Sequence, residues 1–172
     1  MNIPHDKFCV LPWVSLETSP IGTVRPCCLA DDEIVDNNGK KFNLSTANFL
    51  DIQNSNHMQD LRQQFLDGRQ PQTCRKCFRE ERSGRTSKRM HTLDRLKHVI
   101  PPQDWTIDAK PLMFLDLKLG NICNLKCRIC GSWSSSQFAT EELQWLGPDE
   151  DRKSSFHYTK LRQGAWPREN PV

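Results

Sequence analysis

The stretch CNLKCRIC contains three cysteines, Cys123, Cys127 and Cys130, at spacings of four and three residues. Three thiols this close in sequence can converge on one point, but disulfides form from pairs and a structural zinc site takes four ligands. A metal centre with one open coordination position would suit three thiolates. The triplet is therefore a candidate metal site.

The other five cysteines fall into three groups: Cys9 alone, the adjacent Cys27 and Cys28, and the CxxC of Cys74 and Cys77. We expect Cys9, Cys27, Cys74 and Cys77 to form one four-thiolate site. Adjacent residues on an extended segment face opposite sides, so Cys28 should point elsewhere. Cys27 and Cys28 could exchange roles, and four thiolates suit either a zinc ion or an iron–sulfur cluster.

A hairpin and several helices must bring these thiols together. The runs WVSLETS and TVRPCCL flank PIG and predict a hairpin that turns at residues 20–22 and returns Cys9 towards Cys27. A loop rich in Asn and Asp follows it. The segment SNHMQDLRQQFLDG then predicts a helix, with Ser55 as its cap and Gly68 at its end. Its apolar residues recur at helical spacing: Met58, Leu61, Phe65 and Leu66.

Residues 74–98 are helix-prone, interrupted at Gly84, and carry nine Lys or Arg against three acidic residues. The net charge of the whole chain is +3, so positive charge is concentrated in this segment. A nucleic-acid or phosphate-binding surface is one interpretation. We favour a solvated helix face with internal ion pairs, because no series of aromatic residues for base stacking is interleaved with the charges.

The C-terminal part begins after a proline-rich linker, residues 101–111. Residues 112–119 predict a buried strand with Leu115, Leu117 and Leu119 on one face, and residues 134–146 predict a helix. The cysteine triplet then lies in a loop between a strand and a helix, which is the catalytic edge of parallel α/β folds.

The motif CNLKCRIC, with Ile129 before its last cysteine, resembles the CxxxCxxC signature of the radical S-adenosylmethionine enzymes. The stretches FCVLPWVSLETSPIGTVRPCC and CRKCFREERSGRTSKR resemble the twitch (SPASM-related) module, which holds an auxiliary iron–sulfur cluster. The resemblance implies that Cys123, Cys127 and Cys130 hold a [4Fe–4S] cluster whose fourth iron binds S-adenosylmethionine, and that Ile129 contacts the adenine of this cofactor. It also implies that Cys9, Cys27, Cys74 and Cys77 hold the auxiliary cluster.

Reductive cleavage of S-adenosylmethionine, driven by an electron donor such as flavodoxin or ferredoxin, is the activity that this resemblance implies. The substrate would be a peptide or a small molecule. The family's partial barrel has about six βα units and this chain contains one, so we expect the N-terminal portion of a longer enzyme, inactive alone. The strand at 112–119 should accordingly show an exposed apolar edge. The alternative is a non-catalytic zinc or iron–sulfur binding module.

The expected fold class is α+β. An auxiliary-cluster module spans residues 1–100, the first βα unit of the barrel spans 112–147, and a polar tail spans 148–172. No window of the sequence contains the roughly 20 apolar residues of a membrane helix, and the first 20 residues do not resemble a signal peptide. We therefore expect a cytoplasmic protein with no membrane partner, in which cysteines bind metal rather than form disulfides.

Overall fold

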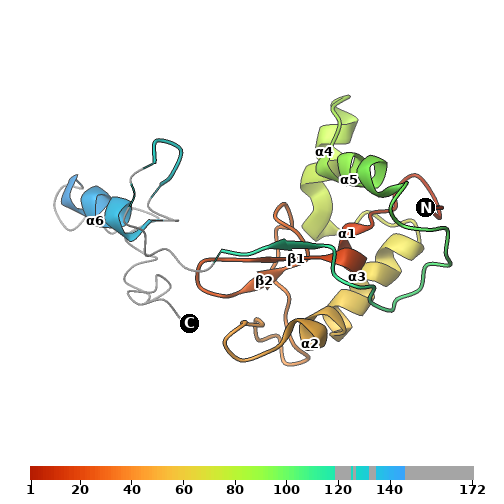
Figure 1. Cartoon of the computed structure of the whole chain (residues 1–172), viewed down its shortest axis with the longest axis horizontal. Coiled ribbons are helices and arrows are strands. Elements are labelled where there is room, and N and C mark those ends of the chain that lie inside the picture. The colour runs from red at the N-terminus through yellow and green to blue at the C-terminus, as the bar shows by residue number, and fades with distance from the viewer. Residues whose placement is uncertain (119–124, 126, 132–134, 146–172) are drawn as a thin grey trace. The chain divides into compact units, whose positions relative to one another are not determined.

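The computed structural model describes residues 1–118, 125, 127–131 and 135–145. The described chain is small and mixed α+β, with a three-stranded sheet and short helices (Figure 1). In chain order the elements are α1 (Leu11–Val14), β1 (Ser15–Thr18), β2 (Val24–Arg25), α2 (Phe49–Gln53), α3 (Asn56–Leu66), the 3₁₀ turn η1 (Gln72–Cys74), α4 (Arg75–Arg82), α5 (Lys88–Leu96), β3 (Phe114–Asp116) and α6 (Ser136–Trp145). No helix in these described ranges is long and apolar enough to cross a membrane.

Contacts divide the chain into two units. The first comprises Met1–Glu17 and Thr23–Asp116, and the second comprises the hairpin turn Thr18–Gly22 and the chain from Leu117 onwards. Within the second unit, the Lys118 N–H donates to the Thr18 hydroxyl at 2.9 Å. The predicted domain division at residues 100, 111 and 147 stays a prediction, and the predicted tail, residues 148–172, lies outside the described residues.

The predicted hairpin is confirmed: β1 and β2 are neighbours in the sheet, joined by a turn in which Gly22 has a φ of 81°. Its first run is not wholly extended, because Trp13 and Val14 belong to α1, where Pro12 favours the first helical turn. β1 also pairs in parallel with β3, from Ser15 opposite Phe114 to Glu17 opposite Asp116. The sheet order β2-β1-β3 therefore joins the N-terminal hairpin to a strand far along the chain (Figure 1).

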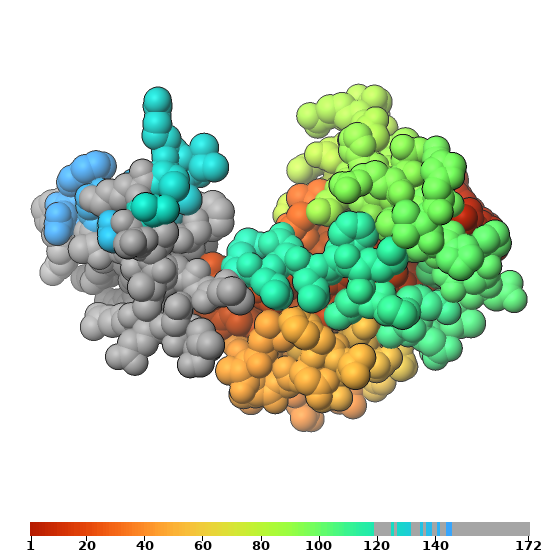
Figure 2. All heavy atoms as spheres, in the orientation of Figure 1, coloured from red at the N-terminus to blue at the C-terminus, as the bar shows by residue number. Residues whose placement is uncertain are grey.

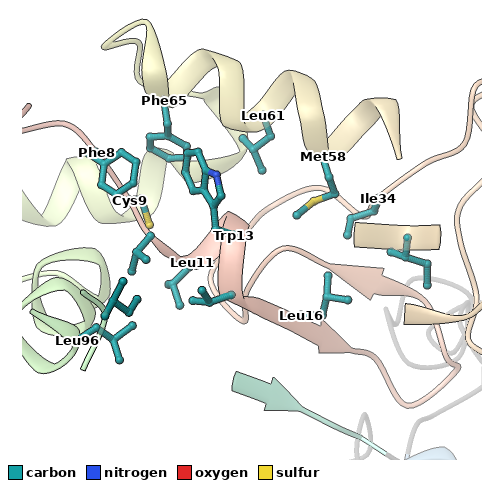
Figure 3. Close-up of a cluster of buried hydrophobic side chains, with 14 of the residues drawn as sticks. Phe8, Cys9, Leu11, Trp13, Leu16, Ile34, Met58, Leu61, Phe65 and Leu96 are labelled. Atoms are coloured by element: carbon teal, nitrogen blue, oxygen red, sulfur yellow. The ribbon is translucent and has the colours of Figure 1, made fainter. Parts of the chain in front are cut away.

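The hydrophobic core lies between α1, α3 and the hairpin (Figure 3). Trp13 is fully buried, and its ring centroid lies 4.9 Å from that of Phe8 and 5.4 Å from that of Trp105. From α3, the buried side chains of Met58, Leu61 and Phe65 face this core, as their spacing predicts. The core thus fixes the segment that carries Cys9 directly against α3.

Two helices end just before glycines, as predicted. Gly68 and Gly84 have φ values of 72° and 76°, which L side chains rarely adopt, and they follow α3 and α4 respectively. The basic segment is accordingly two helices, as predicted. Ser55 occupies the N-cap position of α3, but its hydroxyl donates to the Ile52 carbonyl instead of capping the helix.

The predicted linker is bound to the first unit by buried polar side chains. Arg62, with 0% of its surface exposed, donates to the carbonyls of Pro12, Gln53 and Ile107 at 3.0, 2.7 and 3.0 Å. The Gln53 amide donates to the Trp13 carbonyl at 2.7 Å and to the Lys110 carbonyl at 3.1 Å. These bonds hold the chain in position just before β3.

The strand predicted at 112–119 is confirmed in part: it is limited to β3, and its leucine face is exposed and not buried. Leu115 and Leu117 are 46% and 43% exposed, which matches the expected exposed apolar edge, while Leu112 and Phe114 pack against the core. The leucines point outward because successive side chains of a strand point to opposite faces, and only one face meets the core. The helix predicted at 134–146 is confirmed as α6.

Candidate metal centre

Four cysteines from three separate segments line one small cavity. Cys9 precedes α1, Cys27 follows β2, and Cys74 and Cys77 lie at the end of η1 and in the first turn of α4. The cavity has a volume of about 20 Å³, and apolar side chains complete most of its wall: Leu11, Leu29, Ala30, Phe65 and Phe78. The structure thus brings together the four thiols that the sequence grouped.

Backbone N–H groups close to three of these thiols lower their pKa, against the larger effect of burial. The N–H of Leu11 acts on Cys9, and those of Leu29 and Ala30 act on Cys27. The N–H of Arg89, at the N-terminal end of α5, acts on Cys77. Such donors stabilise negative charge on sulfur, so the surrounding backbone suits thiolates better than an ordinary apolar core does.

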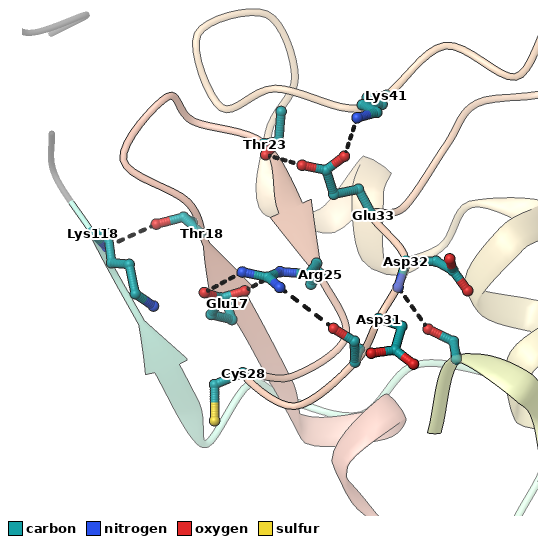
Figure 4. Close-up of polar contacts among 12 residues, drawn as sticks. Glu17, Thr18, Thr23, Arg25, Cys28, Asp31, Asp32, Glu33, Lys41 and Lys118 are labelled. Atoms are coloured by element: carbon teal, nitrogen blue, oxygen red, sulfur yellow. Dashed lines mark hydrogen bonds and ion pairs between the residues drawn. The ribbon is translucent and has the colours of Figure 1, made fainter. Parts of the chain in front are cut away.

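Asp31 and Thr73 join the segment after Cys27 to the CxxC. The Asp31 N–H donates to the Thr73 carbonyl at 2.9 Å. The Asp32 N–H donates to the Thr73 hydroxyl at 3.0 Å (Figure 4). The Asp31 carboxylate also pairs with Arg75 at 2.6 Å and Lys76 at 2.8 Å. Both cations lie between Cys74 and Cys77 in sequence, so the contacts fix the CxxC relative to Cys27.

A second ion pair, between Glu17 and Arg25, fixes the turn that carries Cys27. The Arg25 guanidinium donates to both oxygens of the buried Glu17 carboxylate, at 2.8 and 3.2 Å, and to the Ala30 carbonyl at 3.4 Å (Figure 4). The turn is closed by the Ala30 N–H, which donates to the Cys27 carbonyl at 3.1 Å. The hairpin and the turn are therefore held as one piece.

Burial raises the pKa of all four thiols. For Cys9 and Cys74 the proximity of the other cysteines raises the pKa further, since neighbouring thiolates would repel one another. Without a cation among them the four groups stay protonated at neutral pH. A metal centre that binds here must displace these protons and supply positive charge.

The donor set fits a thiolate-bound metal centre. In the part of the chain that the structure describes, no three His, Cys, Asp or Glu side chains are arranged to hold one metal ion. The four thiols instead surround a space that, at about 20 Å³, holds about one water molecule. A larger group can enter only if the cysteine side chains turn outward as their protons leave.

Cys28 points away from this cavity, as predicted, but not because the two cysteines lie on an extended segment. Cys27 and Cys28 lie in a turn, not on an extended strand. Cys28 lines a separate cleft of about 490 Å³ between α5 and β3, where Lys88 Nζ donates to its sulfur at 3.1 Å. Figure 2 shows this region, with the green atoms of α5 above the teal atoms of the β3 segment.

The CxxxCxxC triplet is described only in part. Cys123 lies outside the described residues, Cys127 is exposed and Cys130 is half-buried. The Cys130 N–H donates to the Cys127 carbonyl at 2.9 Å, so these two cysteines flank a tight turn. Ile129, at its centre, is 94% exposed. Metal binding by the triplet and adenine contact by Ile129 stay predictions.

The basic segment contains cations in ion pairs and exposed arginines that form no ion pair within the described residues. Arg75 and Lys76 pair with Asp31, Arg89 pairs with Glu81, and Lys97 pairs with Asp94. The remaining arginines, Arg79, Arg82, Arg85 and Arg95, are exposed. Nucleic-acid binding by this surface stays a prediction.

Sequence reasoning missed the groups that support the thiols. Arg89, Asp31 and Thr73 were not singled out, because a charge count cannot tell a buried arginine from an exposed one. One local signal was available: Ser87 precedes a helical run, and its side chain caps α5 by accepting the Met90 N–H. That cap places the first turn of α5, and with it the Arg89 N–H, against Cys77.

Comparison with known proteins identifies one family model, SPASM, an iron-sulfur cluster-binding domain, which matches residues 9–78. A search of curated proteins and a search of solved structures gave no match. The matched residues begin at Cys9, end just after Cys77, and contain all four cysteines of the cavity. The match supports a SPASM-type iron–sulfur cluster-binding module in this part of the chain.

Proposed function

We propose that Cys9, Cys27, Cys74 and Cys77 bind an auxiliary iron–sulfur cluster. The observation that carries this proposal is the convergence of these four thiols on one apolar cavity, within the residues that match the SPASM model. The donor set is complete, because four thiolates satisfy the four irons of a cubane cluster. The backbone N–H groups near Cys9, Cys27 and Cys77 would stabilise the added negative charge.

The family model favours a cluster over the zinc alternative, because it describes an iron-sulfur cluster-binding domain and the matched residues contain all four cysteines. Four thiolates by themselves suit either group. The cavity of about 20 Å³ is smaller than a multi-iron group, so the cysteine side chains must turn outward when a cluster binds.

An auxiliary cluster held by four cysteines has no open iron, so the chemistry it supplies is one-electron transfer. The chain's own contribution is to exclude water from the site with Leu11, Phe65 and Phe78. The electron donor would be an acidic carrier such as flavodoxin or ferredoxin. Support comes from the exposed arginines of α4, Arg79 and Arg82, which lie on the same helix as Cys77.

The second part of the proposal concerns the triplet. We propose that this chain belongs to a cytoplasmic radical S-adenosylmethionine enzyme, with Cys123, Cys127 and Cys130 as ligands of the cofactor-binding [4Fe–4S] cluster. The parent enzyme would modify a peptide or small-molecule substrate. Support comes from the CxxxCxxC spacing, from the turn at Cys127–Cys130, and from a strand with an outward apolar face at 115 and 117. That face suits coverage by the further strands and helices of a barrel.

Anaerobic reconstitution with iron and sulfide tests both parts. The auxiliary site is tested by a matched pair of variants, Cys27→Ser and Cys28→Ser, because the two positions are adjacent and only Cys27 lines the four-cysteine cavity. We expect Cys27→Ser to lose about half of the bound iron and Cys28→Ser to lose none. Equal losses from both variants, or zinc without sulfide in the purified protein, would contradict the auxiliary cluster.

Replacement of Cys123, Cys127 and Cys130 together by Ala should remove the other half of the iron. If this triple variant retains all of its iron, the proposed role of the triplet is wrong. The four-cysteine site is judged separately by the Cys27 and Cys28 pair, so the two parts of the proposal can fail independently.

A further inference from the structure

Glu81 and Arg89 form an ion pair beside the four-cysteine cavity. Arg89 Nε and Nη2 donate to the two carboxylate oxygens of Glu81 at 2.9 and 2.6 Å. The Arg89 side chain is only 7% exposed, and Arg89 lines the same cavity as the four thiols. Both charges are therefore shielded from solvent near the proposed cluster, where charges interact more strongly than at the surface.

The same arginine connects two of the cysteine segments. Its Nη1 donates to the carbonyls of Asp6 and Phe8 at 2.6 and 2.8 Å, directly before Cys9. Its backbone N–H lies close to the Cys77 thiol and lowers the pKa of that thiol. Its guanidinium also lies 5.2 Å from the centre of the Phe78 ring. A residue needed only to neutralise Glu81 would not require these further contacts.

Glu81 connects Arg89 to the helix that carries Cys77. It follows Cys77 by four residues in α4, so the two side chains lie on the same face, one helical turn apart. It accepts a hydrogen bond from the Ser87 hydroxyl as well as from Arg89. The carboxylate is thus fixed to the helix that carries Cys77, and the guanidinium to the segment that carries Cys9.

We propose that the Glu81–Arg89 pair sets the reduction potential of the auxiliary cluster. This inference rests on the proposed cluster and adds to it the residues that control its electron affinity. A cluster with four thiolates has a net negative charge, and reduction makes it more negative. Arg89 therefore stabilises the reduced form and raises the potential, while Glu81 lowers it, because local charge and hydrogen bonds to sulfur tune such centres.

Redox titration followed by electron paramagnetic resonance tests this directly. The full chain would carry Ala at 123, 127 and 130, so that only the auxiliary cluster contributes. We expect Glu81→Gln to shift the potential to more positive values and Arg89→Gln to shift it to more negative values. Arg89→Lys keeps the charge but loses the bidentate geometry, so its potential should stay closer to that of the parent.

Asp94→Asn provides the matched control, because it also removes a carboxylate from an ion pair but at the exposed end of α5. Its potential should equal that of the parent. A purely structural role for the pair predicts shifts of the same sign, or none, in Glu81→Gln and Arg89→Gln, and either result would overturn the inference. If Arg89→Gln does not fold, the sign of the Glu81→Gln shift decides.

The proposed cluster and the proposed role of the ion pair can be tested separately. A parent protein that takes up no iron and sulfide overturns the proposed cluster and this inference with it. A parent that takes up a cluster, with Glu81→Gln unchanged in potential, overturns only the role of the ion pair.

Discussion

Arg62 is a buried cation that hydrogen-bonds three backbone carbonyls, and its replacement by methionine tests what holds β3 in place. The acceptors belong to Pro12 at α1, Gln53 at the end of α2, and Ile107 before β3. Methionine has similar length and no donors. Arg62→Met therefore keeps most of the packing and removes all three hydrogen bonds.

The magnitude follows from the acceptors that lose their partner. The bonds to the Pro12 and Gln53 carbonyls are buried, whereas water can reach the Ile107 carbonyl. Each buried acceptor left without a donor costs about 1–3 kcal/mol, so the two cost about 2–6 kcal/mol. Methionine recovers part of this, because burial penalises the guanidinium and lowers the pKa of Arg62 to about 10. We expect a net loss of about 2–4 kcal/mol in the free energy of unfolding.

Urea denaturation of the metal-free, reduced chain, followed by far-ultraviolet circular dichroism, gives this free energy. Hydrogen exchange should also accelerate at the amides of Lys110 and Met113, which donate to the carbonyls of Trp13 and Val14. The exposed Arg69→Met serves as control, with an expected change within about 0.5 kcal/mol. If Arg62→Met is as stable as the parent and its amide exchange is unchanged, the reasoning is refuted.

Two further outcomes can be measured. The pKa of Asp31 is lowered by hydrogen bonds from Lys76 and by the nearby Arg75, so its ion pairs stabilise the fold above the usual carboxyl pKa of about 3.9 and are lost as the pH falls through the lowered value. The free energy of unfolding of Asp31→Asn should therefore fall less steeply as the pH is lowered than that of the parent. If the free energies of unfolding of the two proteins change in parallel across this pH range, the ion pairs of Asp31 do not stabilise the fold. The reconstituted, dithionite-reduced chain should not form 5′-deoxyadenosine from S-adenosylmethionine over several turnovers; sustained formation, measured by chromatography, would show that these 172 residues suffice.

Local sequence signals predicted most of the secondary structure. The hairpin turn at Gly22 and the helix ends at Gly68 and Gly84 follow from the ability of glycine to adopt positive φ. The apolar face of α3 follows from the helical spacing of its apolar residues. These features depend on neighbours within a few residues. The grouping of the four cysteines was also predicted, from the hairpin that returns Cys9 towards Cys27 and from the CxxC.

Features that depend on distant contacts could not be predicted in this way. Four of the five carbonyl groups that bind the buried side chains of Arg62 and Arg89 lie 45 to 83 residues away in the chain, and only that of Gln53 is as near as nine residues. The outward position of Leu115 could not be predicted for the same reason: an alternating pattern identifies two faces of a strand, but not which one meets the core. Only the pairing of β3 with β1 decides that.

The parallel pairing of β1 with β3 also orders the events of folding. Its partners, such as Ser15 and Phe114, are about a hundred residues apart, and closing so long a loop is slow compared with the formation of hairpins and helices. Cys27, Cys74 and Cys77 all lie inside that loop, and Cys9 lies before it. The centre they form can therefore assemble during synthesis, before β3 has left the ribosome. The edge of β1 then becomes the template on which the strand leading to the second cysteine motif is added.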